Sequence, residues 1–454
     1  MSRKKGMDML NGSISDKILL FALPLAASSI LQQLFNSADV AVVGRYAGSA
    51  PLAAVGSTGP VIGLLINLFV GLSIGANVVA AKYIGQNNED AVRRTVHSSI
   101  LLALVSGFVL LILGQLIIKP ILEFMSTPED VLPLATKYMR IYFCGMPFIM
   151  LYNFGSALLR SIGDTRRPLI CLTVSGVINV LLNLFFVIVC KMSVAGVGIA
   201  TVASNLVSSS LIILFLIKEK SIIHLDLKQL KADKGILKEV ARIGVPAGVQ
   251  GIVFSFSNVC IQGALNTFGS VVVAGSSAAL NFEYYTFYVL SAYGQTCTTF
   301  VSQNMGAGNL KRCLQIVMRT AGMMLLSVAA VVSVFLIFDR ELLSLFTTDA
   351  EVMKWGIVRM HVILGFQVVN GLIETFSGAL RGMGHSAIPA VISIVGVCGL
   401  RLVYVNTVFK YFNTLQGLLA VYPISWIITS TAIITAFIIT YIKKNNESRR
   451  TAAA

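Results

Sequence analysis

The stretch SALLRSIGDTRRP (156–168) returns in altered form as SGALRGMGHSAIP (377–389). Three pairs of identical residues in these stretches have the same separation along the chain: Arg160 and Arg381, Gly163 and Gly384, and Pro168 and Pro389. Gly85 and Gly306 keep this separation, and Pro24 and Pro246 depart from it by a single position. A long fixed period indicates an internal duplication, so we expect two copies of one structural unit.

The composition places both copies in a membrane. Of the 454 residues, 56% are hydrophobic and 12% are charged, whereas soluble domains carry about 25% charged residues. A helix that crosses a bilayer needs about 20 mostly apolar residues. Twelve ranges meet this requirement: 18–43, 53–79, 96–118, 134–159, 169–189, 196–217, 243–267, 271–301, 318–338, 355–380, 388–409 and 418–442. The sequence therefore predicts an all-α integral membrane protein with twelve transmembrane helices.

The duplication divides these helices into two six-helix bundles. Because six is an even number, both copies enter the membrane from the same side, which gives parallel repeats with a cavity between them. We expect an N-terminal lobe at 1–217, a cytoplasmic linker at 218–242, a C-terminal lobe at 243–442 and a cytoplasmic tail at 443–454. Two facing six-helix bundles are chiefly a transporter arrangement.

The Lys and Arg residues predict the orientation. With the N-terminus placed inside, 25 of the 35 basic residues fall in inside segments and nine fall in outside segments or at the adjoining helix ends. Cytoplasmic loops carry such an excess. We therefore predict a multi-pass protein of the inner (cytoplasmic) membrane with both termini in the cytoplasm. The basic residues form no contiguous patch, so the net charge of +15 does not indicate a nucleic-acid partner.

Four ionisable side chains are expected deep in the predicted spans: Asp39, Glu283, Glu374 and Arg401. Each costs about 2.5–3.5 kcal/mol at the bilayer centre, so each needs a partner or a function. We expect Arg401 to neutralise Glu283 or Glu374 as a structural pair. Alternatively, Glu283 and the adjacent Tyr284 form a surface for an organic cation, through charge and cation–π attraction.

Asp39 differs from the other three because its own predicted helix contains no basic residue. Gln32 and Asn36 share its helical face. Other helices of the first half add neutral hydrogen-bonding groups: Asn153, Asn179, Asn183, Thr201 and Asn205. A carboxylate among such groups can bind and release a proton, and the same oxygens can ligate Na⁺. The alternative is that Asp39 caps the end of its helix near the outer surface.

Pro24 and Pro246 interrupt the first and seventh predicted helices. A proline inside a span frees a carbonyl group and permits bending. Pro24 lies fifteen residues before Asp39, about four helical turns. Bending of the first helix could therefore be coupled to protonation of Asp39, and a static kink is the alternative.

These features together resemble the multidrug and toxic compound extrusion (MATE) family. The likeness rests on LRSIGDTRRP and LRGMGHSAIP, on SQNMGAGN after the eighth helix, and on Pro24 followed by Asp39, and it extends from about Ile14 to Ile442. It implies a secondary antiporter that expels cationic or amphipathic compounds in exchange for H⁺ or Na⁺ by alternating access. We expect no cofactor and no metal site, except that Na⁺ is a candidate ion at Asp39.

The resemblance also implies roles for individual residues. Asp39 matches the first-helix carboxylate of proton-coupled bacterial and archaeal members, with Asn179, Asn183 and Thr201 around it. The sodium-type branch carries acids where this chain has Phe254 and Asn370, and some proton-coupled members carry a second Asp in place of Asn183. These departures favour the prokaryotic branch of proton-coupled type. The expected substrate-cavity residues are Gln32, Asn36, Asn153, Asn205, Glu283, Tyr284, Asn370 and Glu374, the last one turn beyond Asn370.

Two other functions compete with an antiporter. A flippase for a polyprenyl-linked lipid or saccharide would need a strongly basic cavity for pyrophosphate, and Arg401 alone is too little. A membrane-embedded enzyme would need a clustered catalytic set, and the sequence contains no HExxH motif and no Ser/His/Asp arrangement. We therefore expect a transporter, acting as a monomer, whose partners are small organic cations and the lipid bilayer.

Overall fold

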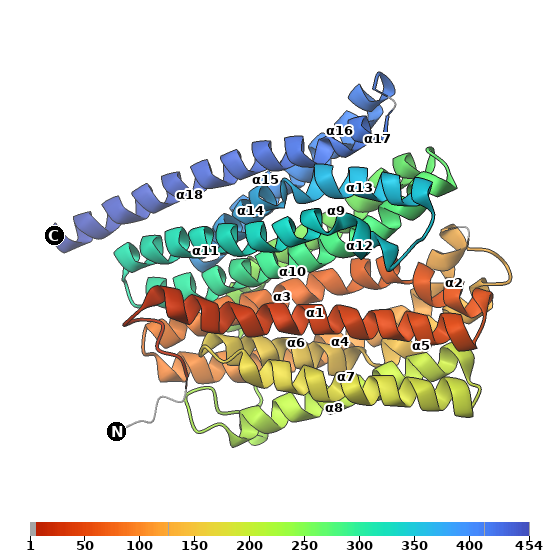
Figure 1. The fold of residues 1–454 in the computed structure, drawn as a ribbon. Coiled ribbons are helices and arrows are strands. Elements are labelled where there is room, and N and C mark those ends of the chain that lie inside the picture. Colours follow the sequence, from red (N-terminus) through yellow and green to blue (C-terminus); the bar gives the residue numbers. More distant parts are fainter. Residues whose placement is uncertain (1–5, 126, 413, 454) are drawn as a thin grey trace. The chain divides into compact units, whose positions relative to one another are not determined.

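The computed structural model describes residues 6–125, 127–412 and 414–453. Within them, every regular element is helical (Figure 1). Three basic residues counted for the orientation (3–5) and the last residue of the predicted tail (454) lie outside the described residues.

The first half of the chain contains α1 (Ile14–Tyr46), α2 (Ser49–Ser57), α3 (Gly59–Gly85), α4 (Glu89–Phe124), α5 (Leu132–Cys144), α6 (Met146–Ser161), α7 (Arg166–Leu184) with the π-helical η1 (Phe185–Val189), and α8 (Ser193–Lys218). A 3₁₀ turn, η2 (Leu227–Gln229), precedes the second half. That half contains α9 (Lys234–Asn266), α10 (Ser270–Gly306), α11 (Leu310–Ile337), α12 (Asp339–Ser344), α13 (Ala350–Leu364), α14 (Gln367–Gly382), α15 (Ala387–Ser393), the π-helical η3 (Ile394–Gly399), α16 (Leu400–Asn406), η4 (Val408–Lys410), α17 (Leu415–Leu419) and α18 (Val421–Ala453).

The twelve predicted spans correspond to helical segments of this fold. Nine helices in the described residues are long and apolar enough to cross a membrane, and the bent pairs α5–α6 and α13–α14 raise the number to eleven. The remaining predicted span is α10, which has 37 residues and therefore sufficient length. Its many Ser, Thr, Asn, Gln and Tyr side chains lower its hydropathy. The prediction of an all-α membrane protein is confirmed.

The backbone repeats with the sequence. Gly163 and Gly384, which belong to the two quoted stretches, have φ angles of 88° and 87°. These are left-handed conformations that glycine adopts without steric cost. Asn88 and Asn309 have the same separation along the chain as these glycines, and their side chains accept hydrogen bonds from backbone N–H groups at the starts of α4 and α11. The duplication therefore extends to helix ends and turns.

Contacts between residues divide the chain into two compact units. Within the described residues, unit 1 contains residues 6–8 and 27–248, and unit 2 contains residues 9–26 and 249–453. Both boundaries fall inside helices, in α1 after Ala26 and in α9 after Gly248. Each lies two residues beyond the internal proline of its helix, Pro24 in α1 and Pro246 in α9.

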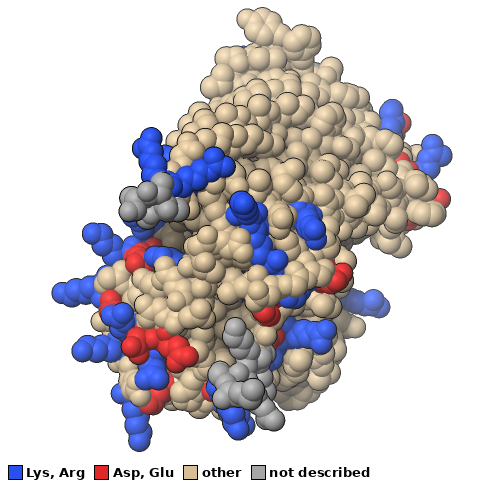
Figure 2. All heavy atoms as spheres, turned by 90° about the vertical axis from the view of Figure 1, so that its left-hand side faces the viewer, with Lys and Arg blue, Asp and Glu red and all other residues tan. Residues whose placement is uncertain are grey.

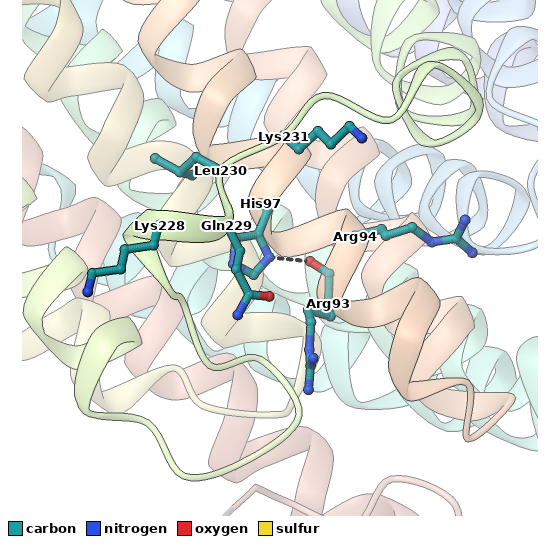
Figure 3. Close-up of a pocket in the computed structure, with 7 residues that line it drawn as sticks. All are labelled: Arg93, Arg94, His97, Lys228, Gln229, Leu230 and Lys231. Atoms are coloured by element: carbon teal, nitrogen blue, oxygen red, sulfur yellow. Dashed lines mark hydrogen bonds between the residues drawn. The ribbon is translucent and has the colours of Figure 1, made fainter.

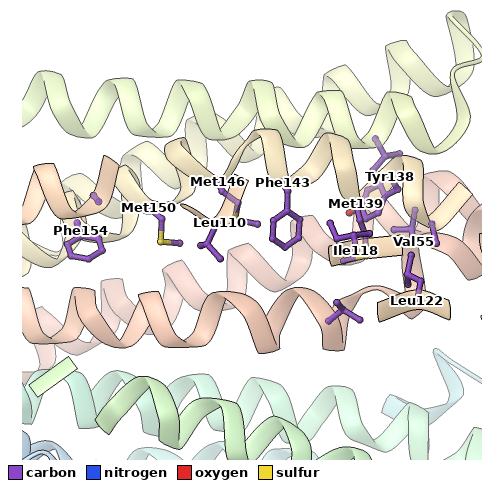
Figure 4. Close-up of a cluster of buried hydrophobic side chains, with 14 of the residues drawn as sticks. Val55, Leu110, Ile118, Leu122, Tyr138, Met139, Phe143, Met146, Met150 and Phe154 are labelled. Atoms are coloured by element: carbon purple, nitrogen blue, oxygen red, sulfur yellow. The ribbon is translucent and has the colours of Figure 1, made fainter. Parts of the chain in front are cut away.

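The core of unit 1 lies where α4, α5 and α6 pack together (Figure 4). Its large side chains are fully buried, including Leu110 and Ile118 of α4, Phe143 of α5 and Met146 and Phe154 of α6. The shared surface of these helices is apolar and tightly packed, so it forms a rigid support for the neighbouring helices.

Glycines bring α3 and the first half of α9 into backbone contact within unit 1. A methyl group added at Gly71 would lie 2.3 Å from the backbone nitrogen of Gly248, and one added at Gly244 would lie 2.5 Å from the Cα of Leu72. Gly71 and Gly75 on α3 face Gly244 and Gly248 on α9, so both helices present a GxxxG motif. Such motifs let membrane helices approach closely and gain van der Waals contact.

Candidate functional site

Asp39 lies well inside its helix. Because α1 continues to Tyr46, Asp39 is about two turns from the helix end and cannot cap it, so the capping interpretation was wrong. The side chain is buried, with 8% of the residue exposed. A carboxylate in this position needs hydrogen-bond partners from neighbouring helices.

The packing of α7 on α1 supplies these partners. Gly176 of α7 faces the ring of Phe35, and any added Cβ at this glycine would overlap the ring. This close approach fixes the register between the two helices. Asn179 and Asn183 follow Gly176 by about one and two turns of α7, and Asp39 follows Phe35 by one turn of α1. Both asparagines are buried.

Side chains of α7 and α8 surround Asp39, and hydrogen bonds join it to α7. The Nδ2 group of Asn183 donates both to the Asp39 carboxylate and to Oδ1 of Asn179, the latter at 3.2 Å. The hydroxyl group of Thr201, on α8, donates to the carbonyl oxygen of Val197 at 2.9 Å and lies near Asp39. The structure therefore brings together the four residues predicted as the cation-coupling site: Asp39, Asn179, Asn183 and Thr201.

The site contains an excess of acceptor oxygens. Oδ1 of Asn183 is buried and has no hydrogen-bond partner in the described residues. It belongs to a group whose side-chain oxygens come from a carboxylate, two amides and a hydroxyl. Such a set favours occupation by a cation, either a proton on the carboxylate or a hard metal ion such as Na⁺.

Two tyrosines near this site were not predicted from the sequence. Tyr138 and Tyr142, one turn apart on α5, lie close enough to interact electrostatically with Asp39. Their i, i+4 spacing on an amphipathic helix was the available signal.

The other polar residues predicted in the first half do not join this cluster. Gln32 and Asn36 are exposed. The side chains of Asn153 and Asn205 donate to carbonyls of their own helices, those of Ile149 and Thr201, both at 2.8 Å. Their placement in a substrate cavity stays a prediction.

In unit 2, Glu283 of α10 forms a buried ion pair with Arg359 of α13. Two hydrogen bonds join them, from Nε of Arg359 to Oε1 at 2.6 Å and from Nη2 to Oε2 at 3.1 Å. The expected partner, Arg401, was therefore wrong. Arg359 is one of the nine basic residues that the sequence analysis placed in outside segments or at the adjoining helix ends, but it is 4% exposed. Its position inside the predicted span 355–380 was the overlooked signal.

Arg401 has no carboxylate partner in the described part of the chain. Its Nη1 donates to Oδ1 of Asn258 and its Nε donates to Oγ of Ser425, both at 3.3 Å. The guanidinium group also lies 4.3 Å from the ring centroid of Tyr422. Tyr422 also lies near Arg359. The two arginines and one carboxylate leave unit 2 with an excess of buried positive charge.

The remaining predicted residues of the second half lie apart from this network. Tyr284 is partly exposed and stacks on Tyr288, with ring centroids 6.5 Å apart. The Nδ2 group of Asn370 donates to Oε1 of Gln367 at 3.1 Å. Glu374 is partly buried and forms no ion pair within the described residues. It is therefore a carboxylate that a cation could use.

Comparison with known families and proteins agrees with the duplicated fold. The MatE family model matches the chain twice, over residues 24–185 and over residues 246–407. The two matched segments begin at Pro24 and Pro246, the pair that already marked the repeat. Together they cover more than half of the chain.

Individual proteins are similar over nearly the full length. A probable multidrug resistance protein, YoeA of Bacillus subtilis (strain 168), is 28% identical over 426 residues, covering 92% of both chains. An FAD transporter of Shewanella oneidensis is 26% identical over 426 residues, covering 92% of this chain and 93% of that protein. The outward-facing structure of a multidrug resistance MATE family transporter has the same fold, with a TM-score of 0.90 and 21% identity over 97% of this chain and 99% of that one.

Proposed function

Because this chain belongs to the MatE family, we propose that it is a secondary antiporter that exports cationic or amphipathic compounds in exchange for a cation. Family membership makes the chain a multi-pass membrane transporter of small molecules rather than an enzyme. The ion exchange, the charge of the substrate and the direction of transport are the parts that we propose.

The observation that carries the proposal is the cluster around Asp39. A buried carboxylate with amide and hydroxyl partners, and with no ion-pair partner in the described residues, is costly in a membrane unless it serves a function. Its protonation removes the charge, and its ionisation restores it. We propose H⁺ as the coupling ion, with Na⁺ as the alternative, and no further cofactor.

Carboxylates in the two halves support a cationic substrate. Asp39 is the carboxylate of the first half. In the second half Glu283 is neutralised by Arg359, so Glu374 is the acid that remains available. Tyr284, next to Glu283 in α10, offers a partly exposed aromatic face for a cation. We further propose that the protein acts as a monomer in the inner membrane, with both termini in the cytoplasm.

Efflux from vesicles tests the coupling. Purified protein is reconstituted, and release of a fluorescent cation such as ethidium is followed under a proton gradient and, separately, under a sodium gradient. Asp39→Asn keeps the size of the side chain but cannot ionise, so coupled efflux should fall to the background of empty vesicles.

The matched control removes a carboxylate that is exposed. Asp90 lies in the first turn of α4 and is exposed, so Asp90→Asn should leave efflux unchanged. If Asp39→Asn is folded and still exports the cation at the rate of the wild type, Asp39 is not the coupling residue.

A second candidate function follows from Arg401, which has no carboxylate partner in the described residues. Buried positive charge suits a substrate with a phosphate or carboxylate group, and a transporter of FAD, which contains a diphosphate, is among the similar proteins. The same vesicles loaded with FAD would distinguish the two functions. Efflux of FAD that Arg401→Gln abolishes, without efflux of ethidium, would favour export of an anion.

A further inference from the structure

A basic pocket lies at one end of unit 1, away from Asp39. It has a volume of about 460 Å³ and lies between the start of α4 and the segment before α9 (Figure 3). Its lining residues include four cations and no acid: Arg93, Arg94, His97, Lys228, Gln229, Leu230 and Lys231. The basic side chains point away from one another around His97 and Gln229 (Figure 3), as expected because like charges repel.

Hydrogen bonds of His97 connect α4 with the segment before α9, the two sides of this pocket. Its Nδ1 faces the carbonyl oxygen of Arg93 at 2.7 Å, so this nitrogen carries the proton and donates. Its Nε2 faces both the backbone N–H of Asp226 at 3.2 Å and the carbonyl oxygen of Asp226 at 3.1 Å. Ser98, the next residue, donates to the carbonyl oxygen of Lys231 and accepts from the backbone N–H of Asp233. His97 therefore has a structural role, and the cations around it are left to bind a ligand.

The nearby carboxylates do not cancel this positive charge. The backbone N–H of Lys228 lowers the pKa of Asp226, and the backbone N–H of Ile236 lowers the pKa of Asp233, so both are ionised at neutral pH. Asp233 pairs with Arg94 at 3.3 Å. Glu89 and Asp90, one turn before Arg93 and Arg94 on α4, do not line the pocket and form no ion pair within the described residues, so the lining itself has four cations and no acid. Arg93, Lys228 and Lys231 form no ion pair in the described residues.

The depth of the pocket matches the lipid headgroups. The apolar run of α4 begins at Ile100. At a rise of about 1.5 Å per residue, His97 lies about 5 Å and Arg94 about 9 Å before it. The headgroup layer extends about 5–8 Å beyond the hydrocarbon on each side of a bilayer. Lys and Arg side chains gather on the face that Figure 2 turns toward the viewer.

We propose that this pocket binds the phosphate group of an anionic phospholipid. The inference is independent of the transported substrate. Basic pockets at the cytoplasmic end of membrane helices suit anionic headgroups. Arg93 belongs to α4, whereas Lys228 and Lys231 precede α9. A phosphate held between them ties the segment before α9 to α4.

Titration of the full-length protein with short-chain phosphatidylglycerol in a neutral detergent tests the proposal. Bound lipid is counted by native mass spectrometry, and thermal unfolding is followed in parallel. Each Lys or Arg near an anionic headgroup contributes about fivefold in affinity. The triple variant R93A/K228A/K231A should therefore bind this lipid about 100-fold more weakly at low ionic strength, and R93K/K231R, which keeps the charges, should bind it like the wild type.

A charge-matched control separates a site from general attraction. Lys220, Lys238 and Lys311 lie outside the pocket, so K220A/K238A/K311A should retain the affinity. Equal weakening in the two triple variants would overturn the proposal, as would equal binding of phosphatidylcholine. Displacement of the lipid by inorganic phosphate at equal concentration would show that the site takes free phosphate instead. If the triple variant does not fold, K228Q/K231Q on the segment before α9 replaces it, and unchanged affinity there would also overturn the proposal.

Discussion

At the scale of single residues, the decisive features are charges and the groups that meet them. Asp39 meets neutral donors and acceptors, whereas Glu283 meets Arg359 in a pair with both partners buried. The first arrangement leaves the Asp39 carboxylate without a fixed counter-charge in the described residues. The second fixes two charges in place, because either one alone would be an uncompensated charge in a medium of low dielectric constant.

Glu283→Gln should therefore destabilise the protein before it alters any substrate preference. Removing one partner of a buried pair costs about 3–5 kcal/mol, because the other charge stays buried without compensation. Thermal unfolding in detergent should show a lower midpoint. The double variant Glu283→Gln with Arg359→Gln removes both charges and should recover most of the loss. A single variant as stable as the wild type would mean that the pair contributes little to the fold.

At the scale of elements, contacts between backbones position the helices. Gly71 and Gly75 on α3 and Gly244 and Gly248 on α9 allow an approach that no side chain would permit. Gly176 does the same for α7 against Phe35 of α1, and this contact delivers Asn179 and Asn183 to Asp39. Small residues therefore decide which polar groups meet.

Gly71→Ala should weaken the docking of α9 on α3. The added methyl group would lie 2.3 Å from a backbone atom of Gly248, so the helices must separate, and overpacking of this kind costs about 1–3 kcal/mol. Gly63→Ala is the matched control on the same helix, because nothing lies within 4 Å of its added methyl group. Thermal unfolding midpoints of the two variants should differ accordingly. Equal midpoints would show that this contact does not limit stability.

At the scale of the whole molecule, two helices belong to both units. The chain passes between the units two residues after Pro24 in α1 and two residues after Pro246 in α9. Proline removes one hydrogen bond of the helix and lowers the resistance to bending. We propose that α1 and α9 bend at these positions during transport.

Pro246→Ala should slow transport without loss of stability. The new N–H group can bond to the carbonyl oxygen of Arg242, four residues earlier, and a stiffer helix raises the barrier to bending. Efflux rates should fall several-fold, while the thermal midpoint stays the same or rises. Pro120 lies inside α4, which belongs to unit 1 alone, so Pro120→Ala should leave the rate unchanged. Efflux by Pro246→Ala at the rate of the wild type would argue against bending at this position.

The sequence by itself determined the number of spans, the duplication and the isolation of Asp39 within its helix. These features are local, because a bilayer requires a fixed length of apolar residues and because a charge far from the ends of such a run is easily recognised. Only the tertiary structure decided that Glu283 pairs with Arg359 and not Arg401, that Asn179, Asn183 and Thr201 meet at Asp39 while Gln32 and Asn36 do not, and that α1 and α9 each belong to two units. Such contacts join residues far apart in the chain, and they depend on helix register and on small residues whose effect appears only when the helices pack.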